Sequence, residues 1–209
     1  MRNILLSEQQ FKKLLNEITI DDVDDAVVDV NLTPTQQQKE AGNYKMGHIS
    51  VKGMRISIEN PKKSYRKWFD KETNTSGSTQ IKNHYGYFRN TRGNGKDGDA
   101  VDVFIGDHID AFDYVFVVDQ KDKNGNFDES KVMLGFLSKD EAKAAYMSNY
   151  SANWHGFMAI TKVTIPIFKK WLYRGNKQQK PFKDYALIIK NKLREKKIKI
   201  TISPKVFPF

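Results

Sequence analysis

The sequence predicts an α+β protein in which short, mainly antiparallel strands are flanked by helices. Between residues 47 and 136, short apolar runs alternate with Gly and Asn turn signals, as in successive hairpins. Two capping boxes, at Ser7 and Ser138, each precede a segment with helical character. A chain of 209 residues with 39% hydrophobic residues is long enough to bury a substantial core.

The N-terminal residues 1–19 are expected to form an amphipathic helix that begins after Ser7. Its apolar side chains recur at helical spacing: Phe11, Leu14, Leu15 and Ile18. Because an isolated helix of this length is marginal in water, the stripe should dock on this domain, on another copy or on another protein. We favour another protein, since the acidic and polar residues 20–41 indicate a linker of low order.

The strands are expected to start after Gly42. Residues 47–51 and 54–58 are predicted to form a hairpin that ends at Glu59. Residues 62–82 are basic and then rich in Ser, Thr and Gly, which indicates a mobile loop over a site or, as the alternative, an ordinary solvated loop.

The second half of the chain is expected to alternate strands and helices. We predict a strand at 100–105, a hairpin of 114–119 with 131–136, and helices at 142–150 and 164–172. A basic helix at 182–197, a short strand at 198–202 and an apolar tail that ends in Phe209 should follow. Such a tail is typical of a docking element for a partner protein.

Charge is unevenly distributed along the chain. The net charge is +10, and from Lys169 onward 13 Lys or Arg face only Asp184 and Glu195. This segment is expected either to bind a polyanion such as nucleic acid or to be a solvated helix face. There is no cysteine, no apolar run of membrane-spanning length and no visible signal peptide, which favours a cytoplasmic protein without a membrane partner.

Three carboxylates, Asp97, Asp99 and Asp102, fall within six residues. Asp97 and Asp99 lie on a turn around Gly98, and Asp102 lies in an otherwise apolar strand pattern. Turn formation alone would explain an isolated Asp-Gly-Asp. A carboxylate in an apolar strand is costly without a cation or hydrogen-bond partners, so the trio indicates a site for a hard divalent ion such as Mg²⁺.

These residues carry a family resemblance. The segment from Asp97 to Val103 resembles the metal-binding signature of the soluble, Mg²⁺-dependent inorganic pyrophosphatases, and Tyr85-Gly86-Tyr87 resembles the segment upstream of it. The strand that ends at Glu59 and the acidic and lysine pair at 128–131 are also similar to that family. More closely, residues 42–172 resemble the pyrophosphatase-like domain of phage and mobile-element polyvalent proteins.

The resemblance implies a small, OB-like, mainly antiparallel β-barrel with flanking helices at 42–172, followed by a basic extension at 173–209. It implies hydrolysis of pyrophosphate or a related phosphoanhydride with Mg²⁺ as the cofactor. Either Asp119 or Asp122 would fill one acidic position, and Asp128 or Glu129 the next. The implied metal ligands are Asp97, Asp99, Asp102 and Asp128; the implied catalytic residues are Asp102, Glu59, Tyr85 and Lys131; the candidate phosphate-binding residues are Lys63, Arg66 and Lys67.

Two other functions are compatible with the sequence. A phage virion structural or cargo protein could reuse the fold and dock through its terminal extensions, which would place the chain in the virion instead of the host cytoplasm. A nucleic-acid-binding module could instead use the basic C-terminal segment, and its binding would then depend strongly on salt and be lost on truncation after Leu172.

Overall fold

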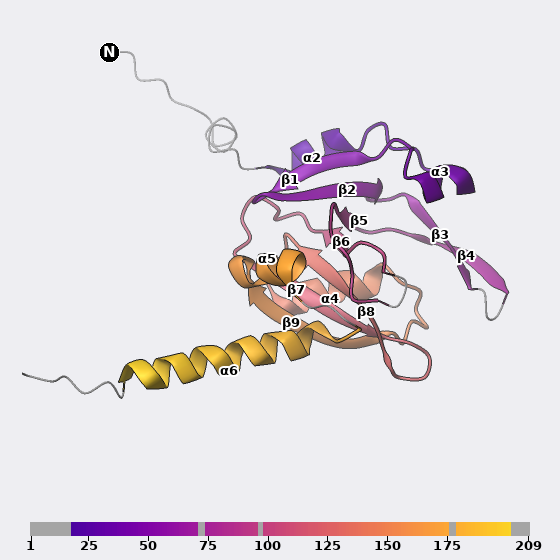
Figure 1. Ribbon diagram of the computed structural model, residues 1–209. Helices are drawn as coiled ribbons and strands as arrows, with labels where there is room; N and C mark the ends of the chain where they lie inside the picture. Colours follow the sequence, from indigo (N-terminus) through magenta and orange to yellow (C-terminus); the bar gives the residue numbers. More distant parts are fainter. Residues whose placement is uncertain (1–17, 71–73, 96–97, 176–178, 202–209) are drawn as a thin grey trace, which may run out of the picture.

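The computed structural model describes residues 18–70, 74–95, 98–175 and 179–201. Its main element is a seven-stranded sheet in the order β1-β2-β5-β6-β8-β7-β9, beside a two-stranded sheet of β3 and β4 (Figure 1). The strands are β1 (Gly47–Val51), β2 (Met54–Asn60), β3 (Tyr65–Asp70), β4 (Thr75–Gln80), β5 (His84–Phe88), β6 (Asp102–Ile105), β7 (Tyr114–Lys121), β8 (Phe127–Leu134) and β9 (Phe157–Thr164). The helices are α2 (Ile20–Ala26), α3 (Gln36–Ala41), α4 (Lys139–Ser148), α5 (Ile165–Arg174) and α6 (Phe182–Thr201).

The predicted α+β class with mainly antiparallel strands is confirmed, but the predicted barrel is wrong. In the described residues β1 and β9 are the two edges of the large sheet and do not pair with each other. All its strand pairs are antiparallel except β6 with β8. The sheet therefore stays open, and helices cover its two faces.

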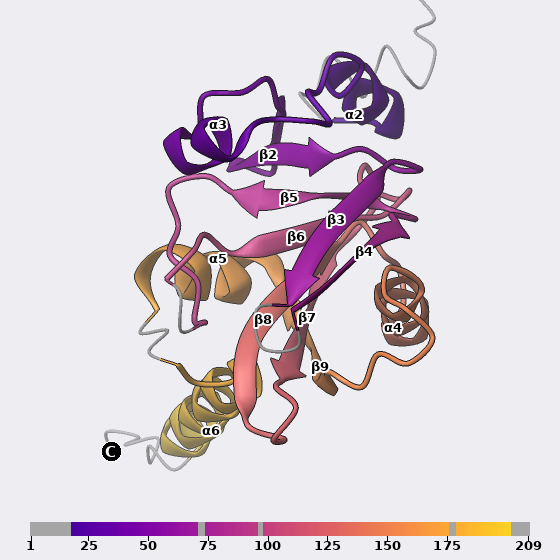
Figure 2. The same ribbon diagram turned by 90° about the vertical axis from the view of Figure 1, so that its right-hand side faces the viewer.

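Successive side chains of the central strands pack alternately into two separate cores, one on each face of the sheet. Val103 on β6 packs in one core with Phe168 of α5, whereas its neighbour Phe104 packs in the other core with Tyr146 of α4. This alternation is the period of a β-strand. Figure 2 accordingly shows α5 and α4 on opposite sides of the sheet. Any polar side chain on the α4 face must lie at the margin of an aromatic core.

The register of the central strands brings charged residues together on the α4 face. Tyr87 pairs with Asp102 across β5 and β6, and Phe104 pairs with Met133 across β6 and β8. Two residues back along β8, Lys131 therefore comes beside Asp102. Position 86 on β5 requires glycine, because an added Cβ would collide with the backbone of the neighbouring strand β2.

The segment expected to be a linker of low order contains two helices, α2 and α3, so that prediction is wrong. Thr19 and Thr35 begin α2 and α3 with complete capping boxes. Val23 of α2 is fully buried in the core that α5 also covers. The polarity of the segment led to the wrong prediction, because the few apolar residues in and beside α2, above all Val23 and Val27, are enough to attach that helix to the core.

The loop expected at residues 62–82 instead contains β3 and β4, so that prediction is also wrong. The two strands pair from Tyr65 with Gln80 to Asp70 with Thr75. This hairpin projects from the body of the molecule in Figure 1 and crosses in front of β6 and β8 in Figure 2. It places the side chains of β3 over the α4 face of the sheet.

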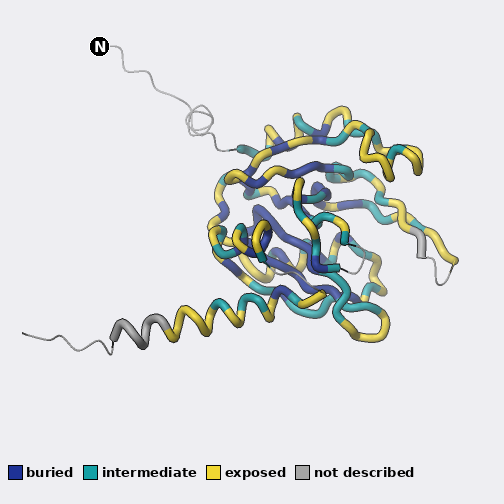
Figure 3. Tube along the Cα trace, viewed as in Figure 1, coloured by how far each residue is buried: buried dark blue, intermediate teal, exposed yellow. Residues whose placement is uncertain are grey.

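The C-terminal half contains one strand that was not predicted and lacks one that was. Phe157–Thr164 forms β9, which pairs with β7 along its length. The predicted strand at 198–202 is wrong at residues 198–201, because α6 continues to Thr201. Figure 3 shows α6 mostly exposed or half-buried beyond its start.

Two segments lie outside the described residues: the predicted N-terminal helix up to residue 17 and the apolar tail from residue 202. No helix in the described part of the chain is both long and apolar enough to cross a membrane.

Candidate functional site

Lys131 is the centre of a charged cluster on the α4 face. Its side chain comes from β8 and is 4% exposed, and its ammonium pairs with Asp102 and, at 2.7 Å, with Glu129. The Tyr85 hydroxyl donates a hydrogen bond of 2.7 Å to the same Asp102 carboxylate. Burial alone would lower the pKa of Lys131, but Asp102, Tyr85 and Glu129 outweigh it and hold that pKa well above its usual range.

Carboxylates line a recess next to this cluster. Glu59, Asp99 and Asp102 border a cavity of about 260 Å³ together with Lys39 and Tyr44. The Tyr44 hydroxyl donates a hydrogen bond to Glu59. Burial, opposed by that hydrogen bond and assisted by the charge of Asp102, raises the pKa of Glu59. We call this cavity and its continuation toward Arg66 the acidic recess.

Cationic side chains border the continuation of the acidic recess. A cavity of about 320 Å³ is lined by Lys39, Arg66 and Lys67 in addition to Glu59 and the two aspartates. The Arg66 guanidinium lies 4.5 Å from the centre of the Tyr85 ring, an arrangement that fixes its orientation. Fixed cations beside carboxylates suit an anion that arrives with a metal ion.

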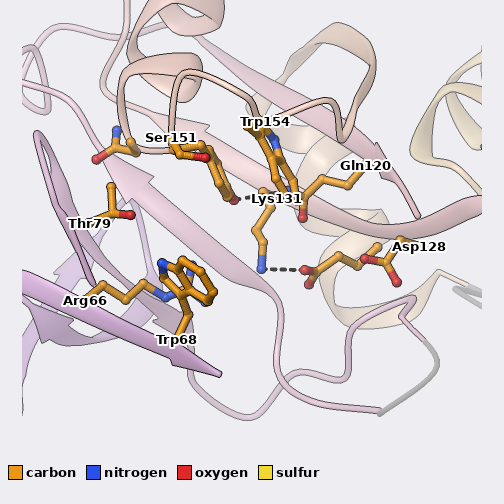
Figure 4. Close-up of a pocket in the computed structure, with 11 residues that line it drawn as sticks. Arg66, Trp68, Thr79, Gln120, Asp128, Lys131, Ser151 and Trp154 are labelled. Atoms are coloured by element: carbon orange, nitrogen blue, oxygen red, sulfur yellow. Dashed lines mark hydrogen bonds and ion pairs between the residues drawn. The ribbon is translucent and has the colours of Figure 1, made fainter. Parts of the chain in front are cut away.

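A second recess adjoins the first and shares Arg66 with it. It has a volume of about 360 Å³ and contains Lys131 and Glu129 (Figure 4). Its remaining walls are aromatic, polar or acidic: Trp68, Thr79, Gln120, Asp128, Asn149, Tyr150, Ser151 and Trp154. We call it the aromatic recess. Tyr150 and Trp154 are stacked, with ring centres 4.5 Å apart.

The structure separates two predicted acidic candidates from the site. Asp119 is fully buried and accepts hydrogen bonds from Ser130 and from the backbone N–H groups of Phe182 and Lys183. Asp122 accepts hydrogen bonds from backbone N–H groups within the β7–β8 turn. Neither lines the acidic or aromatic recess, and both have structural partners.

The predicted phosphate-binding residues divide in the same way. Arg66 and Lys67 line the acidic recess, whereas Lys63 is exposed at a turn with φ of 73° and lines neither recess. Lys62, which precedes Lys63 in the chain, forms an ion pair with Asp107 at 2.8 Å. Asp97 lies outside the described residues, so only Asp99 and Asp102 of the aspartate trio are placed.

The donor chemistry of the acidic recess fits a hard divalent ion. Mg²⁺ prefers carboxylate oxygens and usually keeps several waters, so it needs few protein ligands. Burial raises the pKa of Glu59 although the Tyr44 hydroxyl opposes that rise, so a cation bound beside Glu59 would stabilise its charged form. Among the described residues no three acidic or histidine side chains already converge as a complete metal site.

Two residues of the site were missed by the sequence interpretation. Lys39 lies on α3, which was expected to be linker, and Tyr44 lies on the segment that leads into β1. The Thr35 capping box marks the start of α3 and could have revealed it. No local signal connects either residue with Glu59, because that contact depends on the fold.

Carboxylates that can hold a cation and basic side chains that can hold an anion thus border one recess on the open sheet. Comparison with protein families gives the class: residues 36–173 match the family model described as Inorganic Pyrophosphatase. The chain belongs to the inorganic pyrophosphatase family. Neither the curated proteins nor the solved structures include a significant match to it.

Proposed function

We propose that this protein hydrolyses inorganic pyrophosphate to two phosphates with Mg²⁺. The observation that carries the proposal is the acidic recess, which Glu59, Asp99 and Asp102 border together with the cationic Arg66 and Lys67. Carboxylates on one side can hold a cation while cationic side chains on the other hold phosphate oxygens. Membership of the pyrophosphatase family supports the same reaction.

Asp97, Asp99 and Asp102 would hold the ion, and Glu59, which borders the same recess as Asp99 and Asp102, is the candidate to complete its ligands. Asp128, the other predicted ligand, lines the aromatic recess and not the acidic one. Bound there, Mg²⁺ would lower the pKa of a water and neutralise charge on the phosphoryl group. Where Glu59 is not a ligand, its place beside Asp102 in the acidic recess suits it to accept the proton of the attacking water.

The cationic residues would orient the substrate. Arg66 can bind two phosphate oxygens at once, and its position over Tyr85 limits its movement. Lys131 holds Asp102 in place, and Tyr85 donates to the same carboxylate, so both keep a proposed metal ligand in a fixed rotamer. Preorganisation of this kind lowers the reorganisation needed during reaction.

Phosphate release from pyrophosphate with Mg²⁺ tests the proposal. Asp99→Asn should lower kcat on the order of 100-fold or more, the scale set by removal of a preorganised electrostatic group. Asp102→Asn should do the same, but it also removes a partner of buried Lys131. Asp113→Asn is the matched control, because Asp113 is exposed and lines neither recess. Folded wild type that releases no phosphate would disprove the proposal.

A further inference from the structure

Trp68 presents an aromatic surface beside the charged cluster. Its side chain is 45% exposed although it is one of the largest apolar residues of the chain. It lies two residues from Arg66 on β3, so the two side chains share a face of the strand. Both line the aromatic recess, and Figure 4 shows them together at one side of it.

Gly77 forms the seat of the Trp68 ring. The two residues are paired across β3 and β4, and a Cβ at position 77 would collide with the indole. The ring therefore lies against the backbone of β4 and has a defined orientation. A rigid indole with an exposed surface is a suitable platform for another flat ring.

The surroundings of Trp68 indicate what such a ring would carry. Arg66 extends from the same strand toward the acidic recess, and Lys131 lies in the aromatic recess itself. Trp68 and Arg66 are about 6–7 Å apart along the strand, given its rise per residue. At that spacing, a base stacked on Trp68 and a phosphate bound by Arg66 would leave room for a ribose between them.

We propose that the aromatic recess binds the base of a nucleoside 5′-diphosphate, whose phosphates extend past Arg66 into the acidic recess. The substrate class thus includes nucleoside diphosphates as well as pyrophosphate, an inference that rests on the proposed function. Because Asp128 and Glu129 also line the aromatic recess, a bare polyanion is disfavoured there and the magnesium complex is the appropriate ligand form.

The reaction is the hydrolysis of the phosphoanhydride. Water adds its oxygen to the terminal phosphorus and gives up a proton to a carboxylate of the acidic recess and from there to solvent, and the bridging P–O bond breaks. The electron pair of that bond leaves with the nucleoside monophosphate, and inorganic phosphate is the second product. No oxidant or further reactant is needed.

Competing substrates test the proposal on the full chain. The ratio of kcat/KM for MgADP to that for magnesium pyrophosphate should fall at least about fivefold in Trp68→Ala, since stacking of a base on an aromatic ring contributes about 1–3 kcal/mol. Trp68→Phe should restore most of the ratio. Gly77→Ala should lower it too, because it displaces the ring. Tyr114→Ala, an exposed aromatic outside both recesses, should leave the ratio unchanged.

Calorimetric titration gives a second readout without turnover. With Mg²⁺ present, Trp68→Ala should weaken the binding of α,β-methylene-ADP at least about fivefold relative to the binding of methylenediphosphonate, which has no base. Pyrophosphate turnover without ADP turnover, or a ratio that Trp68→Ala does not change, would overturn this inference and leave the proposed function standing. If neither substrate is hydrolysed, the proposed function fails. The inference that the aromatic recess binds a base then stands only if Trp68→Ala weakens binding of α,β-methylene-ADP relative to methylenediphosphonate, and it fails otherwise.

Discussion

At the scale of single residues, the Lys131 ammonium connects carboxylates of two strands. Asp102 and Glu129 are partly exposed, with side chains 21% and 30% accessible, whereas the Lys131 side chain is 4% accessible. Removal of the cation therefore leaves two nearby negative charges that water can solvate only in part. The cost should lie below that of a fully buried broken pair.

We expect Lys131→Met to lower the free energy of unfolding by about 2 kcal/mol, below the roughly 3–5 kcal/mol for breaking a fully buried pair. Urea unfolding followed by circular dichroism measures this loss. Lys139→Met, at an exposed position in the first turn of α4, should change stability by less than about 0.5 kcal/mol. Equal stability of the two variants would show that Lys131 contributes nothing to the fold.

We expect His84 to make the stability of the fold depend on pH. One ring nitrogen accepts a hydrogen bond from the backbone N–H of Lys62, and the other contacts Asp24 at 2.9 Å. The neutral ring with its proton on the second nitrogen satisfies both contacts. Burial lowers the pKa of His84, and Asp24 offsets only part of this effect.

The direction of the pH effect on stability follows from the difference in the pKa of His84 between the folded and unfolded states. Because the pKa is lower in the folded state, the neutral ring stabilises the fold above its unfolded pKa of about 6.5, and this contribution is lost as pH falls below it. The free energy of unfolding should fall between pH 7.5 and pH 5, by at most about 1.4 kcal/mol per pH unit for this group. His84→Gln should flatten the fall and exposed His155→Gln should not. An unchanged slope in His84→Gln would exclude His84 as its source.

At the scale of elements, Asp119 of β7 attaches the start of α6 to the sheet. Its carboxylate accepts from the backbone N–H groups of Phe182 and Lys183, at 2.7 and 3.1 Å, in the manner of a helix cap supplied by another strand. Burial raises the pKa of Asp119, while hydrogen bonds from Ser130 and from the helix start oppose that rise.

Asp119→Ala should lower the free energy of unfolding by about 2–4 kcal/mol, because it leaves two backbone donors without their charged acceptor. Chemical denaturation measures the loss, and faster amide exchange at Phe182 and Lys183 would locate it at α6. Asp184→Asn removes an exposed first-turn acid of the same helix and should cost at most about 1 kcal/mol. Similar losses in the two variants would contradict the capping role.

At the scale of the whole molecule, the start of the C-terminal helix α6 is part of the core. Phe182 is fully buried, and its ring meets that of Trp171 edge to face at 4.9 Å. Truncation after Leu172, the change that would test nucleic-acid binding by the basic segment, therefore also removes core packing. Neutralising exposed Lys190 and Lys192 would test that hypothesis without this side effect.

A chain that ends at Leu172 should lose at least about 3–5 kcal/mol of stability, the scale for removal of a buried Phe. Thermal unfolding monitored by circular dichroism should show a much lower Tm than that of a chain ending at Glu195, which keeps Phe182. Equal Tm values for the two chains would show that the extension is independent of the domain.

The sequence predicted what depends on local signals. Gly53 and Gly125 are turn signals that correctly predicted their hairpins, and both have positive φ. Asp99 and Asp102, which are close in sequence, line one recess. It could not predict what depends on distant partners. Asp119 and Glu129 are both acidic residues of the β7–β8 hairpin, yet only the packing of α6 assigns the first to structure and leaves the second at the site.

The parallel pairing of β6 with β8 has a consequence for the order of folding. It joins the antiparallel group β1-β2-β5-β6 to the group β8-β7-β9, and parallel pairing of strands is intrinsically slow to form. Asp102 and Lys131 face each other across that junction. The charged cluster is thus assembled late, so Lys131→Met should accelerate unfolding and leave the refolding rate nearly unchanged in stopped-flow experiments. A slower refolding rate would place this junction in the folding nucleus instead.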